Sequence, residues 1–292
     1  MKTKTITLLK HVKRSALRWV SRISLLYLTV KNLLDTRSGV NTAGKRDQNV
    51  IVSLTSYPKR IPYVHLTLET ILSQTFKPDK IILWLSSEES QKADLPHSLL
   101  HLEKRGVEIR YVENNLRSYK KLIYALKEYA NDVIVTADDD VLYPRWWLNN
   151  LYKAHLETPK AVIGYRGRVM QKEQNGTYAP YKHWKVSMTD THDDALLLTG
   201  VGGILYPPNV LDGRVFDEHL FMKIAPNADD IWFKAMAMLR GTLCRKVYEK
   251  SIDFPVIDGT QECALWNANF DKNDQQLNQI FTYYGLLGDG GT

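Results

Sequence analysis

The sequence contains little cysteine. Cys244 and Cys263 are the only two cysteines in 292 residues, and neither belongs to a CxxC pair or to a Cys/His cluster. This composition argues against a disulfide scaffold and against a structural zinc site, and it fits a protein of a reducing compartment.

The sequence also lacks the glycine signatures of two common nucleotide-binding loops. It has no GxGxxG and no GxxxxGK[ST] stretch, so neither a dinucleotide fingerprint nor a P-loop is present. Long hydrophobic runs are missing from the N-terminal segment as well. Its longest stretch without a charged residue, 23–30, is far too short to span a bilayer. No small-residue cleavage site follows that stretch, so we do not expect a secretory signal.

Positive charge is concentrated at the N-terminus. The net charge is +7, but residues 1–37 carry nine Lys and Arg against the single acidic residue Asp35, leaving 30 basic and 31 acidic residues elsewhere. A nucleic-acid-binding groove needs basic side chains spread over a folded face. The charge distribution therefore argues against nucleic acid as a partner.

The N-terminal segment has the periodicity of an amphipathic helix. Its apolar residues recur at three- and four-residue spacings: Leu9, Val12, Ala16, Trp19, Val20, Ile23, Leu26, Tyr27, Val30 and Leu34. The other side carries basic residues four apart: Lys10, Arg14, Arg18 and Arg22. The pattern predicts a helix lying in the interface of an anionic membrane, with Trp19 and Tyr27 at headgroup level. A basic helix packed on the domain or on a partner protein is the alternative.

The polar, glycine-containing stretch 35–48 has the composition of a linker. We therefore divide the chain into a membrane-associating segment with its linker, 1–45, and a globular domain, 46–292. The expected location is peripheral, on the cytoplasmic face of the inner membrane.

The remainder alternates between strand and helix patterns. Strands are predicted over 49–58, 79–86, 107–113 and 132–137, and helices over 61–74 and 118–130, the second capped by Ser118. Further along, a short strand is expected over 204–206 and a helix over 226–239 with Asn227 as its cap. This order predicts an α/β fold with a largely parallel sheet that binds its ligand at the carboxyl ends of the strands.

Three successive carboxylates follow the strand pattern at 133–137. Asp138, Asp139 and Asp140 repel one another unless a cation offsets their charge. Hard oxygen ligands at a strand end suit Mg²⁺ or Mn²⁺, which normally shares its coordination with substrate phosphates. The spacing excludes an EF-hand, and Val141 and Leu142 stand where a DxDxT phosphatase would need its threonine. An exposed acidic turn is the alternative.

Two stretches carry a family resemblance. "VSLTSYPKRIPYVHLTLETILSQTFKPDKIILWLS" resembles the opening of GT-A nucleotide-sugar glycosyltransferases, and "ADDDVLYPRWWL" resembles their DxD motif with its Tyr/Pro-containing turn. The similarity runs from about residue 49 to 147, and a weaker similarity continues to about residue 239. It is closest to bacterial transferases that build capsule or lipopolysaccharide glycans.

The resemblance implies a Rossmann-like GT-A fold and a UDP-sugar donor. A divalent cation, Mn²⁺ or Mg²⁺, would bridge Asp138 and Asp140 to the diphosphate and neutralise the charge on the leaving UDP. The same resemblance implies nucleotide or donor contacts for Thr55, Ser56, Tyr57, Arg60, Lys120, Lys121, Asp139, Gly202 and Gly203. Within that set, the Asp139 side chain is expected to point away from its two neighbours and to matter less.

One stretch departs from the resembled pattern. Many such enzymes place an aspartate after the second strand to bind the base, whereas this chain has "WLSSEES". Ser86, Ser87 or Glu88 are the candidates to replace it.

The acceptor side is predicted from the second half of the chain. The stretch 165–194 is polar and aromatic-rich, and Tyr178, Tyr181 or Trp184 could stack on a sugar face or form a surface excursion without function. Asp229 and Asp230 lie in the first turn of a predicted helix, where they either complement the helix dipole or supply the catalytic base of an inverting enzyme. We assign Asp230 the base and Asp229 an assisting role.

The function predicted from the sequence is sugar transfer from a UDP-sugar to a hydroxyl group of a lipid-linked glycan, with inversion. A retaining transferase, a metal-dependent phosphohydrolase and a non-catalytic membrane-surface binding protein are the alternatives.

Overall fold

The computed structural model describes residues 24–173, 177–187, 195–260 and 270–287. Trp19, the basic ladder before residue 23 and Cys263 lie outside the described residues. No helix within these residues is long and apolar enough to cross a membrane.

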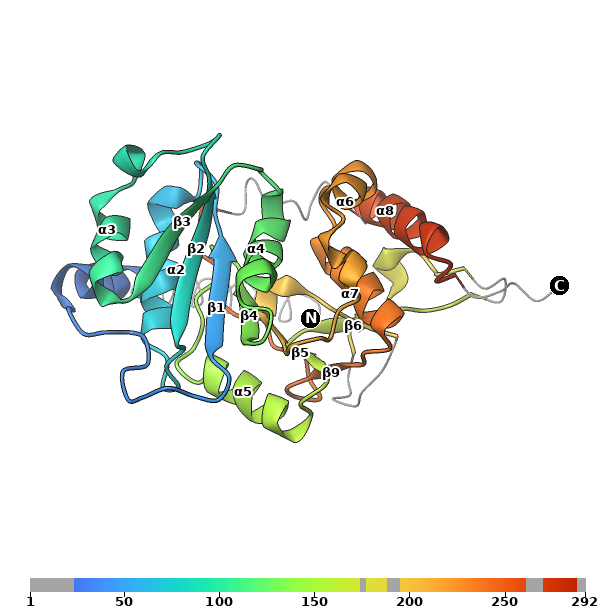
Figure 1. Ribbon diagram of the computed structural model, residues 1–292, viewed down its shortest axis with the longest axis horizontal. Helices are drawn as coiled ribbons and strands as arrows, with labels where there is room; N and C mark the ends of the chain where they lie inside the picture. The colour runs from blue at the N-terminus through green and yellow to red at the C-terminus, as the bar shows by residue number, and fades with distance from the viewer. Residues whose placement is uncertain (1–23, 174–176, 188–194, 261–269, 288–292) are drawn as a thin grey trace, which may run out of the picture.

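In the described residues, a seven-stranded mixed sheet forms the centre of the molecule (Figure 1), in the order β3-β2-β1-β4-β8-β5-β9. Its strands are β1 (Val50–Thr55), β2 (Lys80–Ser86), β3 (Val107–Val112), β4 (Val133–Ala137), β5 (Val162–Gly164), β8 (Ile204–Tyr206) and β9 (Cys244–Lys246). β1 to β4 run parallel, whereas β8 pairs antiparallel with both β4 and β5. The predicted α/β fold with a largely parallel sheet is confirmed.

Helices cover both faces of this sheet. The helices of the described residues are α2 (Ile61–Leu72), α3 (His97–Leu100), α4 (Lys120–Glu128), α5 (Trp147–Glu157), α6 (Glu218–Ile224), α7 (Asp229–Arg240) and α8 (Phe270–Tyr283), of which α8 packs on α6 and α7. Alternate strand residues point to opposite faces. Val50 and Val52 therefore pack with α2 and α5, whereas Ile134 and Ile204 pack with α4 and α7. Burial on both faces explains why the central strands consist mainly of β-branched and aliphatic residues.

A separate pair of short strands lies beside the second half of the sheet. β6 (Gly167–Val169) pairs antiparallel with β7 (Leu196–Leu198). The chain then passes through a 3₁₀ turn, Gly200–Gly202, directly into β8. This pair brings residues near 166 and 199 toward the carboxyl end of β4.

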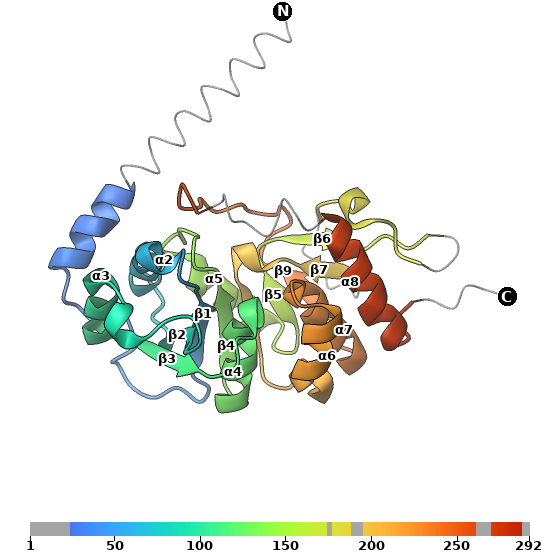
Figure 2. The same cartoon turned by 90° about the horizontal axis from the view of Figure 1, so that it is seen from above.

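The N-terminal helix visible over 24–34 is docked on the domain. Figure 2 shows it beside α2 and α3 at the edge of the molecule. Leu28 packs with Leu66, and the Asn32 amide donates to Glu69 Oε1 at 3.2 Å and to the Ser98 carbonyl at 3.0 Å. Glu69 also pairs with the buried guanidinium of Arg105. Residues upstream of the predicted domain boundary at 46 therefore complete a buried polar network of the domain.

Two predicted helix caps are wrong. Arg117 adopts φ +53° within a 3₁₀ turn, Arg117–Tyr119, so that α4 begins only at Lys120 and the Ser118 hydroxyl is buried without a hydrogen-bond partner among the described residues. At the second helix the cap position is Ala228, and the Asn227 side chain instead accepts from Arg117 Nη1 at 2.7 Å. At Asn227 this tertiary contact takes the place of the local cap.

Candidate active site

The acidic triplet lies at the carboxyl end of β4, on the edge of the sheet that the sequence predicts for ligand binding. Backbone contacts fix it in place. The Asp138 N–H donates to the Tyr143 hydroxyl at 2.9 Å, and the Thr67 hydroxyl donates to the Asp139 carbonyl at 3.0 Å. The Ile257 N–H donates to the Asp140 carbonyl at 2.8 Å. The triplet is thus held between α2 and the segment that follows β9.

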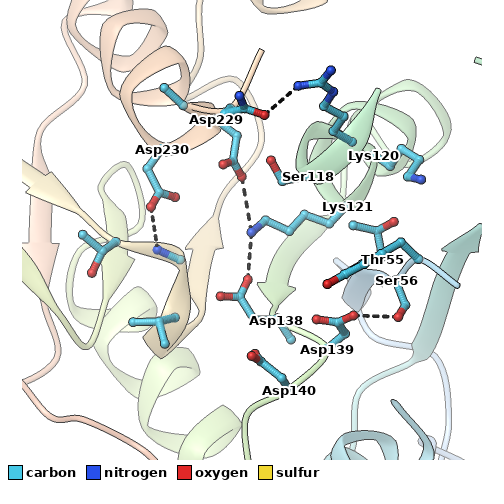
Figure 3. Close-up of a pocket in the computed structure, with 18 of the residues that line it drawn as sticks. Thr55, Ser56, Ser118, Lys120, Lys121, Asp138, Asp139, Asp140, Asp229 and Asp230 are labelled. Atoms are coloured by element: carbon cyan, nitrogen blue, oxygen red, sulfur yellow. Dashed lines mark hydrogen bonds and ion pairs between the residues drawn. The ribbon is translucent and has the colours of Figure 1, made fainter. Parts of the chain in front are cut away.

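A cavity of about 870 Å³ opens over the triplet. Of the predicted site residues it is lined by Thr55, Ser56, Tyr57, Arg60, Lys120, Lys121, Asp138, Asp139, Asp140, Asp229 and Asp230. Residues that lie up to 175 positions apart in the sequence therefore share one chamber, with the triplet on one wall and the first turn of α7 on the other (Figure 3).

Asp139 has a structural role that its sequence position did not reveal. Its carboxylate accepts from Ser56 Oγ at 2.6 Å and from Arg60 Nη1 at 2.7 Å. Burial raises the pKa of Asp139, and Arg60 and Ser56 oppose that rise. Asp139 therefore ties the turn after β1 to the triplet, which means that Ser56 and Arg60 position the site through a carboxylate as well as lining it.

We expect Asp139→Ala to unfold more easily than the wild type, contrary to the minor role that the sequence suggested. The substitution leaves the largely buried Arg60 guanidinium without one of its two carboxylates, which costs about 3 kcal/mol of unfolding free energy. Urea denaturation would measure the loss, with Asp253→Ala, an exposed carboxylate of the same cavity, as the control. Equal stability of the two variants would contradict the structural role.

Lys121 joins the two walls of the cavity. Its Nζ lies 2.8 Å from Asp138 Oδ1 and 3.3 Å from Asp229 Oδ2 (Figure 3). Burial alone would lower the pKa of Lys121, but the carboxylates of Asp138, Asp229 and Asp230 outweigh it and raise the pKa well above its usual value. Lys121 is therefore a permanent cation between the acids.

Lys120 has different partners. It is buried, and its Nζ donates to Asn115 Oδ1 at 2.9 Å and lies 3.6 Å from Glu89 Oε2. Burial lowers the pKa of Lys120, and Glu89 opposes that change. The two adjacent lysines thus face different parts of the cavity. Lys121 contacts the aspartates, whereas Lys120 lies between the segment after β2 and the turn before α4.

Glu89 corrects the expectation for the stretch after β2. It lines the cavity, whereas Ser86, Ser87 and Glu88 do not line the cavity as described for this part of the chain. The Ser87 hydroxyl instead donates to the Val112 carbonyl at 3.1 Å, and the Ser86 hydroxyl accepts from the Glu88 N–H at 3.3 Å. Both serines stabilise the turn after β2. The carboxylate that faces the cavity is therefore that of Glu89, one position after the last of the three candidates.

Asp140 faces a cation as well. Its Oδ2 lies 3.0 Å from Arg60 Nη2 and within 3.4 Å of the Thr260 hydroxyl. Burial and the charge of Asp138 raise the pKa of Asp140 to about 6 despite Arg60. The carboxyl is therefore ionised at neutral pH and readily protonated below it.

The fit of a divalent cation follows from this donor set. In the described residues no group of three His, Cys, Asp or Glu side chains is arranged to hold a metal ion. Asp138 and Asp140 nevertheless both line the cavity, and each is matched by a cationic side chain. Mg²⁺ bound through substrate phosphates needs only one or two carboxylates. The residues present fit a cation that is shared with a diphosphate.

Asp230 stands on the opposite wall. Its Oδ2 accepts the Gly200 N–H at 3.0 Å (Figure 3). The residue is partly exposed to the cavity, but the atoms around its carboxyl desolvate it, and this burial together with the charge of Asp229 raises its pKa to about 7, against the opposing effect of Lys121. A helix N-terminus lowers the pKa of a carboxylate in its first turn, but at Asp230 burial and the charge of Asp229 outweigh that effect.

Among the three glycines before β8, the one that lines the cavity is Gly200 and not the expected Gly202 or Gly203. Gly202 and Gly203 do not line the cavity in the described structure; Gly203, at φ +79°, instead lies against the Trp147 ring, which a Cβ would approach to 2.5 Å. Gly200 is the glycine at the acids. A Cβ there would lie 3.1 Å from Lys121 Nζ and 3.2 Å from Asp230 Oδ1. The sequence shows three glycines here but not which of them faces the cavity.

Comparison with known proteins gives two findings that agree with this geometry. The family model "Glycosyl transferase family 2" matches residues 52–220, more than half of the chain. The mannosyltransferase PcManGT from Pyrobaculum calidifontis, solved in complex with GDP-Man and Mn²⁺, is similar in fold: the TM-score is 0.50 at 17% identity, over 94% of this chain and 76% of that one.

A second solved structure of similar fold is CMP:2-keto-3-deoxy-manno-octonic acid synthetase complexed with CTP. It has 10% identity and a TM-score of 0.42, over 78% of this chain and 99% of that one. No curated protein matches the chain.

Proposed function

Since the chain belongs to glycosyl transferase family 2, we propose that this glycosyltransferase moves a sugar from a UDP-sugar to a hydroxyl group of a lipid-linked glycan, with inversion at the anomeric carbon. The observation that carries the proposal is the pairing of two acidic groups across one cavity. Asp138 and Asp140 end β4 on one wall, Asp229 and Asp230 begin α7 on the other, and Lys121 lies between them.

Each wall suits one half of an inverting transfer. When bound, a divalent cation at Asp138 and Asp140 supplies Lewis-acid neutralisation of the charge that develops on the departing diphosphate. Asp230, with its raised pKa, can accept the proton of the acceptor hydroxyl as that oxygen bonds to the anomeric carbon. Base and leaving group must lie on opposite faces of the sugar, and the two walls offer such a separation.

The direct test is nucleotide-sugar binding followed by transfer. A thermal-shift panel of UDP-, GDP-, CMP- and dTDP-sugars with and without Mn²⁺ should single out UDP-sugars, with a shift that depends on the metal. Preference for another nucleotide would replace the donor in the proposal. Release of phosphate without an acceptor would favour the hydrolase alternative, and a product that keeps the donor's anomeric configuration would favour a retaining enzyme.

The membrane part of the proposal is supported by the docked helix. Its outward face is apolar and exposed: Leu26 68%, Tyr27 63%, Val30 45%, Leu33 70% and Leu34 74%. The opposite face is fixed to the domain through Leu28 and Asn32. The sequence before residue 24 adds seven Lys and Arg and no acidic residue. An apolar stripe continued by a cationic segment suits an anionic lipid surface, which would concentrate a lipid-linked acceptor.

We expect the triple substitution Leu26→Ser, Leu33→Ser, Leu34→Ser to weaken binding to anionic liposomes more than tenfold, because each leucine loses apolar area that the bilayer would bury. Turnover on a lipid-linked acceptor should fall, whereas turnover on a short soluble analogue should not. Cosedimentation with liposomes and the two rates measure this.

Point substitutions are needed here because deleting residues 1–40 would also remove Asn32 and Lys31 from the buried Glu69. Leu156→Ser is the matched control, since Leu156 is an exposed leucine of α5 at 62%. Undiminished liposome binding by the triple variant would reject the stripe as the membrane contact.

A further inference from the structure

The cavity contains positive charge that the proposed reaction does not use. Arg166 and Arg168 flank Gly167 where β6 begins, and both line the cavity. Residues two apart on an extended chain point to the same face. The two guanidinium groups therefore share the wall formed by β6 and β7, which is separate from the Arg60 and Lys121 cations that meet the triplet.

Neither arginine is matched by a buried carboxylate among the described residues. Arg166 Nε lies 3.3 Å from Asp253 Oδ1, but the Asp253 side chain is 79% exposed, and such ion pairs contribute little. Arg168 Nη1 donates to the Trp184 carbonyl at 2.9 Å, and its guanidinium lies 5.2 Å from the centre of the Tyr181 ring. The carbonyl and the aromatic ring orient the Arg168 guanidinium, but neither carries a negative charge that would neutralise it.

The position of Tyr181 shows which part of the cavity this charge serves. Burial raises the pKa of the Tyr181 hydroxyl, the negative charge of Asp230 raises it further, and the charges of Arg168 and Arg166 lower it. All three groups therefore act on one hydroxyl. The backbone shows the same placement: the Arg166 carbonyl accepts from the Thr199 N–H at 3.0 Å, and the N–H of the next residue, Gly200, donates to the Asp230 carboxylate at 3.0 Å. The segment that carries the two arginines therefore lies beside Asp230, where the acceptor hydroxyl must stand.

We propose that Arg166 and Arg168 form an anion subsite for the acceptor, which holds a phosphate or carboxylate group close to the hydroxyl that receives the sugar. Guanidinium groups present paired N–H donors that match both oxyanions. The inference deepens the proposed function and rests on it: the acceptor is an anionic glycan or glycolipid. The anion is either borne on the sugar or is the phosphate that links the sugar to its lipid.

The test uses the full chain saturated with UDP and Mn²⁺, so that the phosphate contacts at the triplet are already occupied. Octyl β-glucoside, octyl β-glucuronide and octyl phosphate are titrated by calorimetry. The glucuronide should bind about tenfold or more tightly than the glucoside if the anion is borne on the sugar, and octyl phosphate should do so if it is the lipid link. Equal affinities for all three probes would overturn the subsite.

The assignment to these residues is tested by Arg166→Gln and by Arg166→Gln combined with Arg168→Gln. The single variant should reduce the preference for the anionic probe and the double variant should remove it. Arg214→Gln combined with Lys223→Gln removes the same charge outside the cavity and should preserve it. A preference that survives the double variant would overturn the proposal, as would a loss of UDP affinity in that variant, since the arginines would then serve the donor.

The two proposals fail separately. If UDP does not bind with Mn²⁺, the proposed donor is wrong, and the same probes are titrated to the enzyme without nucleotide. If UDP binds and the probes do not differ, the proposed function stands and the anion subsite is rejected.

Discussion

Replacing Asp140 with alanine is expected to abolish sugar transfer and the Mn²⁺-dependent part of nucleotide binding. All three carboxylates at the end of β4 line the cavity, but Asp139 is bound by Ser56 and Arg60, which leaves Asp138 and Asp140 as the proposed metal ligands. A cation shared with a diphosphate needs one or two protein carboxylates, so loss of Asp140 removes half of that set. Nucleotide affinity with and without Mn²⁺, measured by calorimetry, separates loss of the metal contact from loss of the fold. Asp138→Ala should be similarly severe.

The pH dependence of the same measurement gives a second readout. Metal ligands must be deprotonated, and the pKa of Asp140 is raised to about 6 by burial and by Asp138. The Mn²⁺-dependent gain in nucleotide affinity should therefore be full at pH 7.5 and be lost as the pH falls through about 6. Asp258→Ala, a neighbouring exposed carboxylate that does not line the cavity as described, is the control. Near-wild-type activity of Asp140→Ala would reject the metal site.

The first half of the fold could be predicted from the sequence because its elements are long and their patterns are unambiguous. β1, β2 and β4 are buried on both faces and consist mainly of aliphatic residues, and α2 keeps one apolar face over twelve residues. Since parallel strands end at one edge, the position of the triplet on the binding edge followed directly. The strands β5, β6, β7 and β9 have three residues each, too few to show a period.

The contacts that complete the site could not be predicted because they depend on the tertiary arrangement. Two adjacent lysines are equivalent in the sequence, yet Lys121 lies between Asp138 and Asp229 while Lys120 turns to Glu89. Adjacent residues of a helix point about 100° apart, and the 3₁₀ turn with its positive φ at Arg117 sets the residue at which α4 begins. No rule of local sequence anticipates such a turn at a non-glycine residue.

The spacing of Arg166 and Arg168 in the sequence already indicates an anionic ligand. Two arginines on either side of Gly167 in "YRGRV" have the period of a strand and place two like charges on one face. Like charges side by side are unfavourable without an anion between them or opposite them. The acidic triplet was interpreted by that argument, and the same argument applied to the arginines would have indicated an anionic ligand.

Asp230, the proposed base on the other wall, must take up a proton during the reaction and not only carry a charge. Its role therefore depends on its pKa. An aspartate in water has a pKa of about 4 and is a weak base. Burial beside Asp229 raises the pKa of Asp230 to about 7. The value of kcat/KM should therefore rise with pH through about 7 as Asp230 loses its proton. Lys121, a cation at every pH of interest, limits the rise in the pKa of Asp230.

The raised pKa also has a consequence for stability. Below about pH 4 Asp230 is protonated in both the folded and the unfolded chain and contributes no difference. As the pH rises toward 7, the unfolded chain releases its proton first, so the wild type loses stability over this window. Asp230→Asn keeps a neutral acceptor for the Gly200 N–H and avoids the loss. Its melting temperature should therefore exceed that of the wild type at pH 8 and approach it near pH 4.

The same substitution should nevertheless lower kcat by about two to four orders of magnitude, because an amide cannot take the proton of the acceptor hydroxyl. Affinity for the nucleotide-sugar should be nearly unchanged, since Asp230 lies on the wall opposite the triplet, and the rise of kcat/KM through about pH 7 should disappear. Steady-state kinetics over pH 5.5–9, with the anomeric configuration of the product determined by NMR, measure all three. A variant that is more stable at pH 8 but turns over at close to the wild-type rate would remove Asp230 from the role of base, and so would a product that retains the donor's anomeric configuration.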